Sequence, residues 1–117
     1  MKTPNKIDYV EFPTNSPSDL ARAKDFFGAV FEWKYQDWGN EYADTHDSGP
    51  NSGISADANE PRKHPLVIVY VDDLETAKER VIGAGGTVTV DIFAFPGGRR
   101  FHFREPTGNE LAAWSDK

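Results

Sequence analysis

The 117-residue sequence predicts an α+β fold of two βαβββ modules that form a curved mixed sheet with a concave cleft. Two observations lead to this prediction. The order of one strand, one helix and three strands occurs twice along the chain. In addition, the motif Asp-Leu-x-x-Ala-Lys at residues 19–24 returns at residues 73–78 in the same helical phase. An internal duplication explains both, with modules over residues 5–56 and 64–117 of one domain, 1–117.

The elements of the first module follow from hydrophobic periodicity and from turn residues. They are a strand over 7–13, a helix over 18–31, and strands over 33–38, 41–46 and 52–56. Ser18 is the expected N-cap of the helix. Phe26, Phe27 and Phe31 recur at helical spacing, so we expect them in the core. A Gly-Asn pair joins the second and third strands, as in tight hairpins.

The second module repeats this order after a polar segment, 57–65, which we interpret as a linker because it holds two prolines. Its elements are a strand over 66–71, a helix that ends at the glycines of 83–86, and strands over 87–95, 99–104 and 110–115. Asp72 and Glu75 have the spacing of a capping box at the helix start.

Composition and charge exclude several classes of protein. The chain has 13 Lys and Arg against 19 Asp and Glu, a net charge of −6, so we expect no nucleic-acid partner. No apolar stretch approaches the roughly 20 residues that span a bilayer, and no signal peptide is visible, so we expect no membrane partner and a cytoplasmic location. The absence of cysteine excludes disulfides, thiolate metal sites and thiol nucleophiles.

Several segments resemble one known family. They are Glu-Phe-Pro at 11–13, the helical segment 20–33, Tyr-Val-Asp-Asp-Leu at 70–74, Gly-Gly at 85–86 and Glu-Pro-Thr-Gly-Asn at 105–109. In this order they resemble the vicinal oxygen chelate superfamily of glyoxalase I, bleomycin-resistance proteins and extradiol dioxygenases. The resemblance implies a glyoxalase/bleomycin-resistance-like fold, a small-molecule ligand and a homodimer. One departure is Glu105, which stands where the family usually has Asp.

The superfamily typically holds a divalent metal with His and Glu side chains on four strands. The resemblance places three of these positions at Tyr9, Leu66 and Ala112, and the segment 48–56 around the fourth contains no His, Asp or Glu. Leu and Ala have no donor atom for a metal, and a neutral Tyr is a poor ligand. We therefore expect no metal ligands and no cofactor, unless a register slip brings His64 to the second position.

Five residues are candidates for a ligand site on the cleft face. Alternation along the first strand places Glu11 beside Tyr9, where the carboxylate could move a proton or balance a cationic ligand. Tyr70 and Trp114 could stack on a flat ligand or fill the space of a lost metal site. His102 lies between two phenylalanines and suits proton transfer, but the sequence leaves open which face it occupies.

These observations predict a small-molecule-binding protein that lacks the usual metal ligands and acts in resistance or sequestration. One alternative is a glyoxalase-like lyase or isomerase in which Glu11 or His102 moves a proton. The other is an accessory module whose cleft is filled by its own side chains. The sequence contains no motif that names the ligand.

Overall fold

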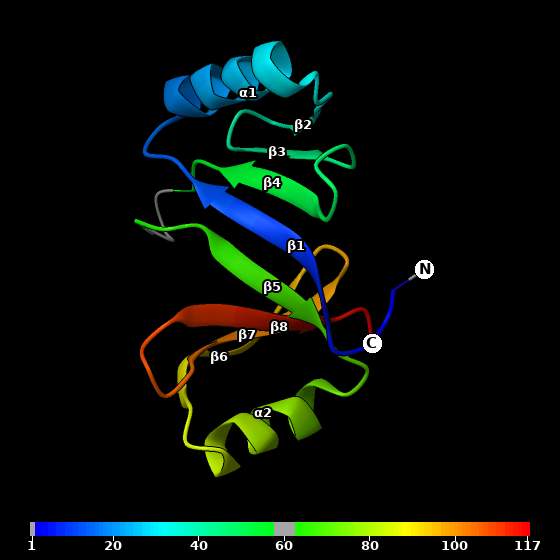
Figure 1. The fold of residues 1–117 in the computed structure, drawn as a ribbon, viewed down its shortest axis with the longest axis vertical. Helices are drawn as coiled ribbons and strands as arrows, with labels where there is room; N and C mark the ends of the chain where they lie inside the picture. Colours follow the sequence, from blue (N-terminus) through cyan, green and yellow to red (C-terminus); the bar gives the residue numbers. More distant parts are fainter. Residues whose placement is uncertain (1, 58–62) are drawn as a thin grey trace. The chain divides into compact units, whose positions relative to one another are not determined.

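The computed structural model describes residues 2–57 and 63–117, which form two compact units. We call Tyr9–Pro65 the N-unit, and Leu66–Lys117 together with Met1–Asp8 the C-unit. Each unit follows the strand–helix–three-strand order, so the predicted α+β fold of two βαβββ modules is confirmed (Figure 1).

The N-unit contains β1 (Lys6–Pro13, whose first three residues belong to the C-unit), α1 (Pro17–Phe31), β2 (Gln36–Trp38), β3 (Tyr42–Thr45) and β4 (Asn51–Ser55). Its strands are ordered β2-β3-β4-β1, and only the β1–β4 pair among them is parallel. The C-unit contains β5 (Leu66–Tyr70), α2 (Leu74–Gly83), β6 (Thr87–Phe95), β7 (Gly98–Arg104) and β8 (Glu110–Ser115). Its strands are ordered β5-β8-β7-β6, with β5 and β8 parallel. In each unit the helix covers one face of the strands (Figure 1).

The core of each unit lies between its helix and its strands. In the N-unit, Leu20 of α1 packs with the buried Ala43 and Ile54, and Phe12 and Phe27 lie against this cluster. The C-unit has the equivalent arrangement, in which Leu74 of α2 packs with Phe101, Ala113 and Val71. Apolar burial of this kind is the main favourable term in folding, so these clusters fix which face of each strand turns toward its helix.

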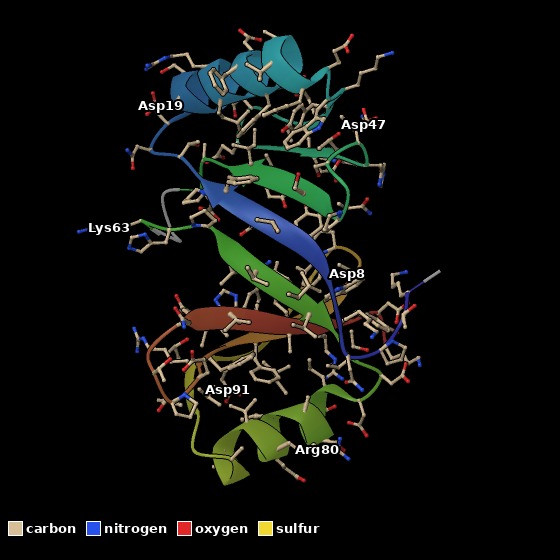
Figure 2. The ribbon with its side chains drawn as sticks, in the orientation of Figure 1. Asp8, Asp19, Asp47, Lys63, Arg80 and Asp91 are labelled. Atoms are coloured by element: carbon tan, nitrogen blue, oxygen red, sulfur yellow. The ribbon has the colours of Figure 1, made fainter. Side chains whose placement is uncertain are left out.

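A pair of matching ion pairs supports the internal duplication. Lys24 of α1 contacts Asp37 of β2 at 2.7 Å, and Lys78 of α2 contacts Asp91 of β6, labelled in Figure 2, also at 2.7 Å. Both residues of the first pair map onto the second by the 54-residue shift that relates the two helices. The repeat therefore extends from the helix motif to the strand that follows it.

The helix caps differ from those predicted. The N-cap of α1 is Ser16, whose Oγ accepts a hydrogen bond from the Asp19 backbone N–H, and Ser18 lies inside the first turn. Proline is well suited to the first turn of a helix, so α1 begins at Pro17, one residue before the predicted start at Ser18. In α2 the cap is Asp73, which accepts from the Thr76 N–H, in place of the predicted capping box that begins at Asp72.

Two of the three phenylalanines predicted in the core are exposed. Phe27 packs against the core, but Phe26 is 60% exposed and Phe31 is 54% exposed. Phe26 lies about 100° around the helix from Phe27 and meets it only at the edge, with 5.8 Å between ring centroids. Phe31 is the last residue of α1, and its ring lies 5.2 Å from that of Trp33 in the following segment.

Other boundaries agree closely with prediction, with one exception. The strand expected over 33–38 is confined to Gln36–Trp38, because the chain first leaves α1 through Glu32 in the left-handed conformation. The predicted linker over 57–65 lies mostly outside the described residues. Neither helix in the described part of the chain is long and apolar enough to span a membrane.

Candidate functional site

The face of the N-unit strands turned away from α1, which we call the N-face, carries polar and aromatic side chains. The core contacts of Phe12, Ala43 and Ile54 identify the helix side, and alternation places their strand neighbours on the opposite side. The N-face positions are Tyr9, Glu11, Pro13, Gln36, Trp38, Tyr42, Asp44, Asn51, Gly53 and Ser55. Two of these ten residues are acidic and none is basic.

A hydrogen-bonded string joins three residues of the N-face. The hydroxyl of Tyr42 donates to Oε2 of Glu11 at 3.1 Å, and the hydroxyls of Tyr9 and Tyr42 lie 2.5 Å apart. A phenol has one hydrogen to donate, so Tyr42 must accept in its bond with Tyr9. The string therefore runs from Tyr9 through Tyr42 to Glu11, and the Tyr9 oxygen can act toward any further group only as an acceptor.

Gly53 makes room for this string. It pairs with Glu11 on one side and with Asp44 on the other, so a row crosses three strands with no side chain at its centre. A Cβ atom at Gly53 would overlap both the Tyr9 and Tyr42 hydroxyl oxygens and would lie 2.7 Å from Tyr42 Cζ. The two phenols therefore meet above Gly53, between the two carboxylate-bearing positions.

Burial and charge act together on this string. Glu11 is only 6% exposed, and its carboxylate accepts from Tyr42. Burial, reinforced by the nearby Glu11 and Tyr9, holds the pKa of the Tyr42 phenol far above its ordinary value. Tyr42 consequently stays protonated and available as a donor to Glu11 throughout the neutral range.

The C-unit has a corresponding face turned away from α2, which we call the C-face. Phe101 and Ala113 pack under α2, so their strand neighbours His102, Ala112 and Trp114 lie on the C-face. This settles the orientation of His102, which is fully buried and stacks near Phe93 with 5.7 Å between ring centroids. The sequence left open which face His102 occupies, and the structure places its imidazole on the C-face, away from α2.

The two predicted aromatic ligand contacts, Tyr70 and Trp114, are neighbours on the C-face. They pair across β5 and β8, and their rings meet edge to face at 5.3 Å. The Trp114 Nε1–H donates to Asp8, labelled in Figure 2, at 3.0 Å. The Tyr70 hydroxyl donates to Asp116 at 2.8 Å, and this bond raises the pKa of Tyr70. This contact joins two neighbouring strands of the C-unit.

An arginine stands among aromatic rings elsewhere on the C-face. The Arg100 guanidinium lies 5.3 Å from the centroid of Phe93 and 5.6 Å from that of Phe95, within the range of cation–π attraction. Phe95 also approaches Trp114, at 6.1 Å. The adjacent Arg99 points elsewhere and donates to Glu75 of α2 at 2.6 Å, which makes it a structural contact.

The residues at the metal positions implied by the family resemblance do not fit a metal. Leu66 is 1% exposed and Ala112 is 0% exposed, and neither has a donor atom. Tyr9 is tied to Tyr42. The slip that would use His64 is not present, because β5 begins at Leu66 and places Ile68 opposite Ala112, with His64 exposed outside the strand. Across residues 2–57 and 63–117, His, Asp and Glu form no group of three that could hold a metal ion.

Sequence reasoning named Glu11 and Tyr9 as candidates but did not name Tyr42 or Gly53, which contact them in the structure. One signal was available, since a glycine inside a strand often marks a close approach by another group. Tyr42 offered no such signal. Its contact with Glu11 depends on strand register, because the two residues lie 31 positions apart and on strands that are not direct neighbours.

Comparisons with known proteins agree with this description of the fold. The family model of the Glyoxalase/Bleomycin resistance protein/Dioxygenase superfamily matches residues 6–113. No curated protein matches the sequence. Among solved structures, the chain resembles an NAD-dependent benzaldehyde dehydrogenase from Legionella pneumophila, with a TM-score of 0.72, 15% identity, and coverage of 93% of this chain and 98% of that one.

Two further structures share the fold. A Mn(II)-bound glyoxalase from Novosphingobium aromaticivorans has a TM-score of 0.69 and 19% identity, covering 99% of this chain but only 40% of that one. A methylmalonyl-CoA epimerase from Mycobacterium tuberculosis has a TM-score of 0.67 and 12% identity, with coverage of 98% and 91%. At such identities the likeness concerns the fold alone, so activity has to be argued from the site.

Proposed function

The chain belongs to the glyoxalase/bleomycin resistance protein/dioxygenase superfamily, and on this premise we propose that it binds a small organic molecule without side-chain metal ligands. The observation that carries the proposal is the set of residues at the metal positions that the family resemblance implies. Leu66 and Ala112 offer no donor, and the Tyr9 hydroxyl is hydrogen bonded to Tyr42. Each unit has a helix-free face that carries aromatic rings and hydrogen-bonding groups, which suits recognition of an organic ligand.

The proposed action is sequestration, in which the ligand leaves unchanged. Binding sites combine apolar surface with a few polar groups of fixed orientation, and both faces provide such groups. On the N-face the string fixes the phenols of Tyr9 and Tyr42, and on the C-face Asp8 fixes the Trp114 indole. Because these side chains are already held in place, less conformational entropy is lost on binding.

Thermal unfolding tests the proposal. Chelator-treated protein is scanned alone, with Zn²⁺, Ni²⁺, Mn²⁺ or Fe²⁺, and with a library of aromatic and cationic compounds. A ligand present at about 100 times its Kd adds about 2.7 kcal/mol to the free energy of unfolding. We expect such a rise with organic compounds and none with the ions. The proposal fails if one ion binds stoichiometrically and raises the midpoint, or if no organic compound does.

A second candidate, a proton-transferring lyase or isomerase, is favoured by the hydrogen bond from Tyr42 to Glu11. A buried carboxylate coupled to two phenols has the composition of a proton relay. The test follows exchange of the acidic C–H proton of carbonyl compounds in D₂O by NMR, with wild-type protein and Glu11→Gln. Faster exchange with the wild type alone would support catalysis, whereas equal rates would remove Glu11 from any mechanism.

The homodimer implied by the family resemblance remains a prediction. The chain has a mass of 13.1 kDa, so sedimentation equilibrium should give twice that value. A mass equal to one chain at all concentrations would contradict it.

A further inference from the structure

We propose that the Trp114 ring of the C-face and the Asp116 carboxylate form a site for an alkylammonium ion, and that Lys2 occupies this ammonium site until a ligand displaces it. The inference rests on the proposed small-molecule binding and names the class of ligand. The observation that points to this class is an ammonium group of the protein itself, which the structure places on the ring. All residues of the site belong to the C-unit.

The N-terminal segment, residues 2–5, reaches the end of β8 through Lys2 (Figure 1). The Lys2 Nζ lies 5.6 Å from the centroid of the Trp114 ring and 3.5 Å from Oδ2 of Asp116. The face of an indole attracts a cation at this distance more strongly than the other aromatic side chains do. A carboxylate adds charge-assisted hydrogen bonding to the N–H groups. The ring and the carboxylate therefore recognise an ammonium ion together, and Lys2 is the ion that they hold.

Tyr70 holds both parts of the ammonium site in place. Its ring meets the Trp114 ring edge to face, and the indole is also fixed by its hydrogen bond to Asp8. The Tyr70 hydroxyl donates to Oδ1 of Asp116 at 2.8 Å, which lowers the pKa of this carboxyl and keeps it ionised at neutral pH. The other oxygen, Oδ2, is the one that meets Lys2. A site arranged in advance loses less conformational entropy when a ligand binds.

The contact of Lys2 with this site is suited to displacement. Asn5 has the left-handed conformation, with φ 66°, and its backbone N–H donates to the Tyr70 carbonyl at 2.8 Å. Beyond this anchor, the segment is tied to the site through the Lys2 ammonium, and the side chains of Lys2 and Asp116 are 45% and 38% exposed. Exposed ion pairs contribute little to stability. Lys2 can therefore leave the ring while Asn5 keeps the segment attached.

NMR titration with n-butylamine tests the inference. This amine is cationic at neutral pH and reproduces the four-carbon stem and ammonium group of a lysine side chain. The signal followed is the indole N–H of Trp114, identified by its loss in Trp114→Phe, and the indoles of Trp33 and Trp38 are internal controls. We expect n-butylammonium to shift the Trp114 signal saturably, and neutral 1-butanol and anionic butanoate to leave it in place.

Variants test the role of Lys2. Lys2→Ala removes the competing ammonium, so the affinity for n-butylammonium should rise about two- to tenfold. Lys6→Ala is the matched control, because it removes the same charge from an exposed position on β1 and should leave the affinity unaltered.

A second substitution, made in the Lys2→Ala protein, tests the carboxylate without interference from the competitor. Asp116→Asn keeps an oxygen that can accept from Tyr70 but removes the charge. It should lower the affinity for n-butylammonium about two- to fivefold.

The outcomes distinguish this inference from the proposed function. The inference is overturned if the Trp114 signal does not respond to n-butylammonium, if 1-butanol shifts it equally, or if Asp116→Asn leaves the affinity unchanged. It is also overturned if Lys2→Ala and Lys6→Ala bind n-butylammonium alike. If library compounds stabilise the protein in those cases, the proposed function stands without the ammonium site. If no organic compound binds, both the inference and the proposed function fail.

Discussion

Gly53 is the residue on which the geometry of the N-face string depends. The phenols of Tyr9 and Tyr42 meet above it, in space that any side chain would occupy. A glycine within a strand costs conformational entropy in folding. In return, the absence of a side chain at Gly53 lets the two phenols form their hydrogen bond, which an alanine at this position would prevent.

Replacing Gly53 by alanine should destabilise the protein. The new Cβ would force both phenols out of position, and overpacking of this kind typically costs about 1–3 kcal/mol. Urea unfolding measures the change. Gly83→Ala is the matched control, because no atom lies within 4 Å of its new Cβ and alanine favours a helix by up to about 1 kcal/mol. A Gly53→Ala protein as stable as the wild type would show that the phenols do not meet above Gly53.

Tyr42 makes the stability of the protein sensitive to alkaline pH. Its pKa is raised in the folded state, while an unfolded tyrosine ionises near pH 10. The folded chain therefore holds this proton more tightly than the unfolded chain. Stability from Tyr42 is complete below about pH 10 and is lost as pH rises further.

Urea unfolding at several pH values above about 10 should show this loss. For Tyr42 alone, the free energy of unfolding should fall by up to about 1.4 kcal/mol per pH unit. Tyr42→Phe removes this contribution, so its stability should decline less steeply than that of the wild type. Tyr35 and Tyr70, whose pKa values are also raised, are present in both proteins and contribute equally to their pH dependence. If the stability of both proteins fell equally steeply with pH, the loss could not be assigned to Tyr42.

At the scale of elements, local sequence decided which segments form helices but left their first residues uncertain. Several polar residues that can cap a helix stand together before α1, and the structure uses one of them as the N-cap. That residue is Ser16, with φ −161° and ψ 160°. The choice depends on the path of the chain into Pro17, which composition does not specify.

Alanine substitutions separate the two candidate caps of α1. Ser16→Ala removes the acceptor for the Asp19 N–H and should lower the free energy of unfolding by about 1 kcal/mol. Ser18→Ala leaves that bond intact, and we expect a change within about 0.5 kcal/mol. Thermal unfolding of the two variants measures the difference. A larger loss for Ser18→Ala would restore the cap predicted from sequence.

Strand alternation shows a similar limit. The sequence placed His102 and its flanking phenylalanines on opposite faces of one strand but could not say which face meets the helix. The packing of Phe101 beneath α2 decides it. Helical spacing likewise grouped Phe26 with Phe27, although only Phe27 reaches the core. Periodicity defines faces, and the partner element selects the buried one.

At the scale of the molecule, the duplication is the strongest signal in the chain. The two helix motifs, the paired core leucines Leu20 and Leu74, and the two lysine–aspartate pairs follow one 54-residue shift. The copies have nevertheless diverged in charge, because the N-unit carries −5 and the remainder −1. A shared fold therefore presents an acidic N-face in one unit and an arginine among aromatic rings in the other.

The sequence by itself determined the fold class, the repeat, nearly all strand boundaries and the family, because these depend on periodicity, turn residues and motif order. It also identified Leu66 and Ala112 as residues without metal donors. Only the tertiary structure decided that Tyr42 joins Tyr9 to Glu11 and that Gly53 makes room for the two phenols. The physical reason is that these contacts depend on strand register, which joins residues more than 30 positions apart and which no local pattern specifies.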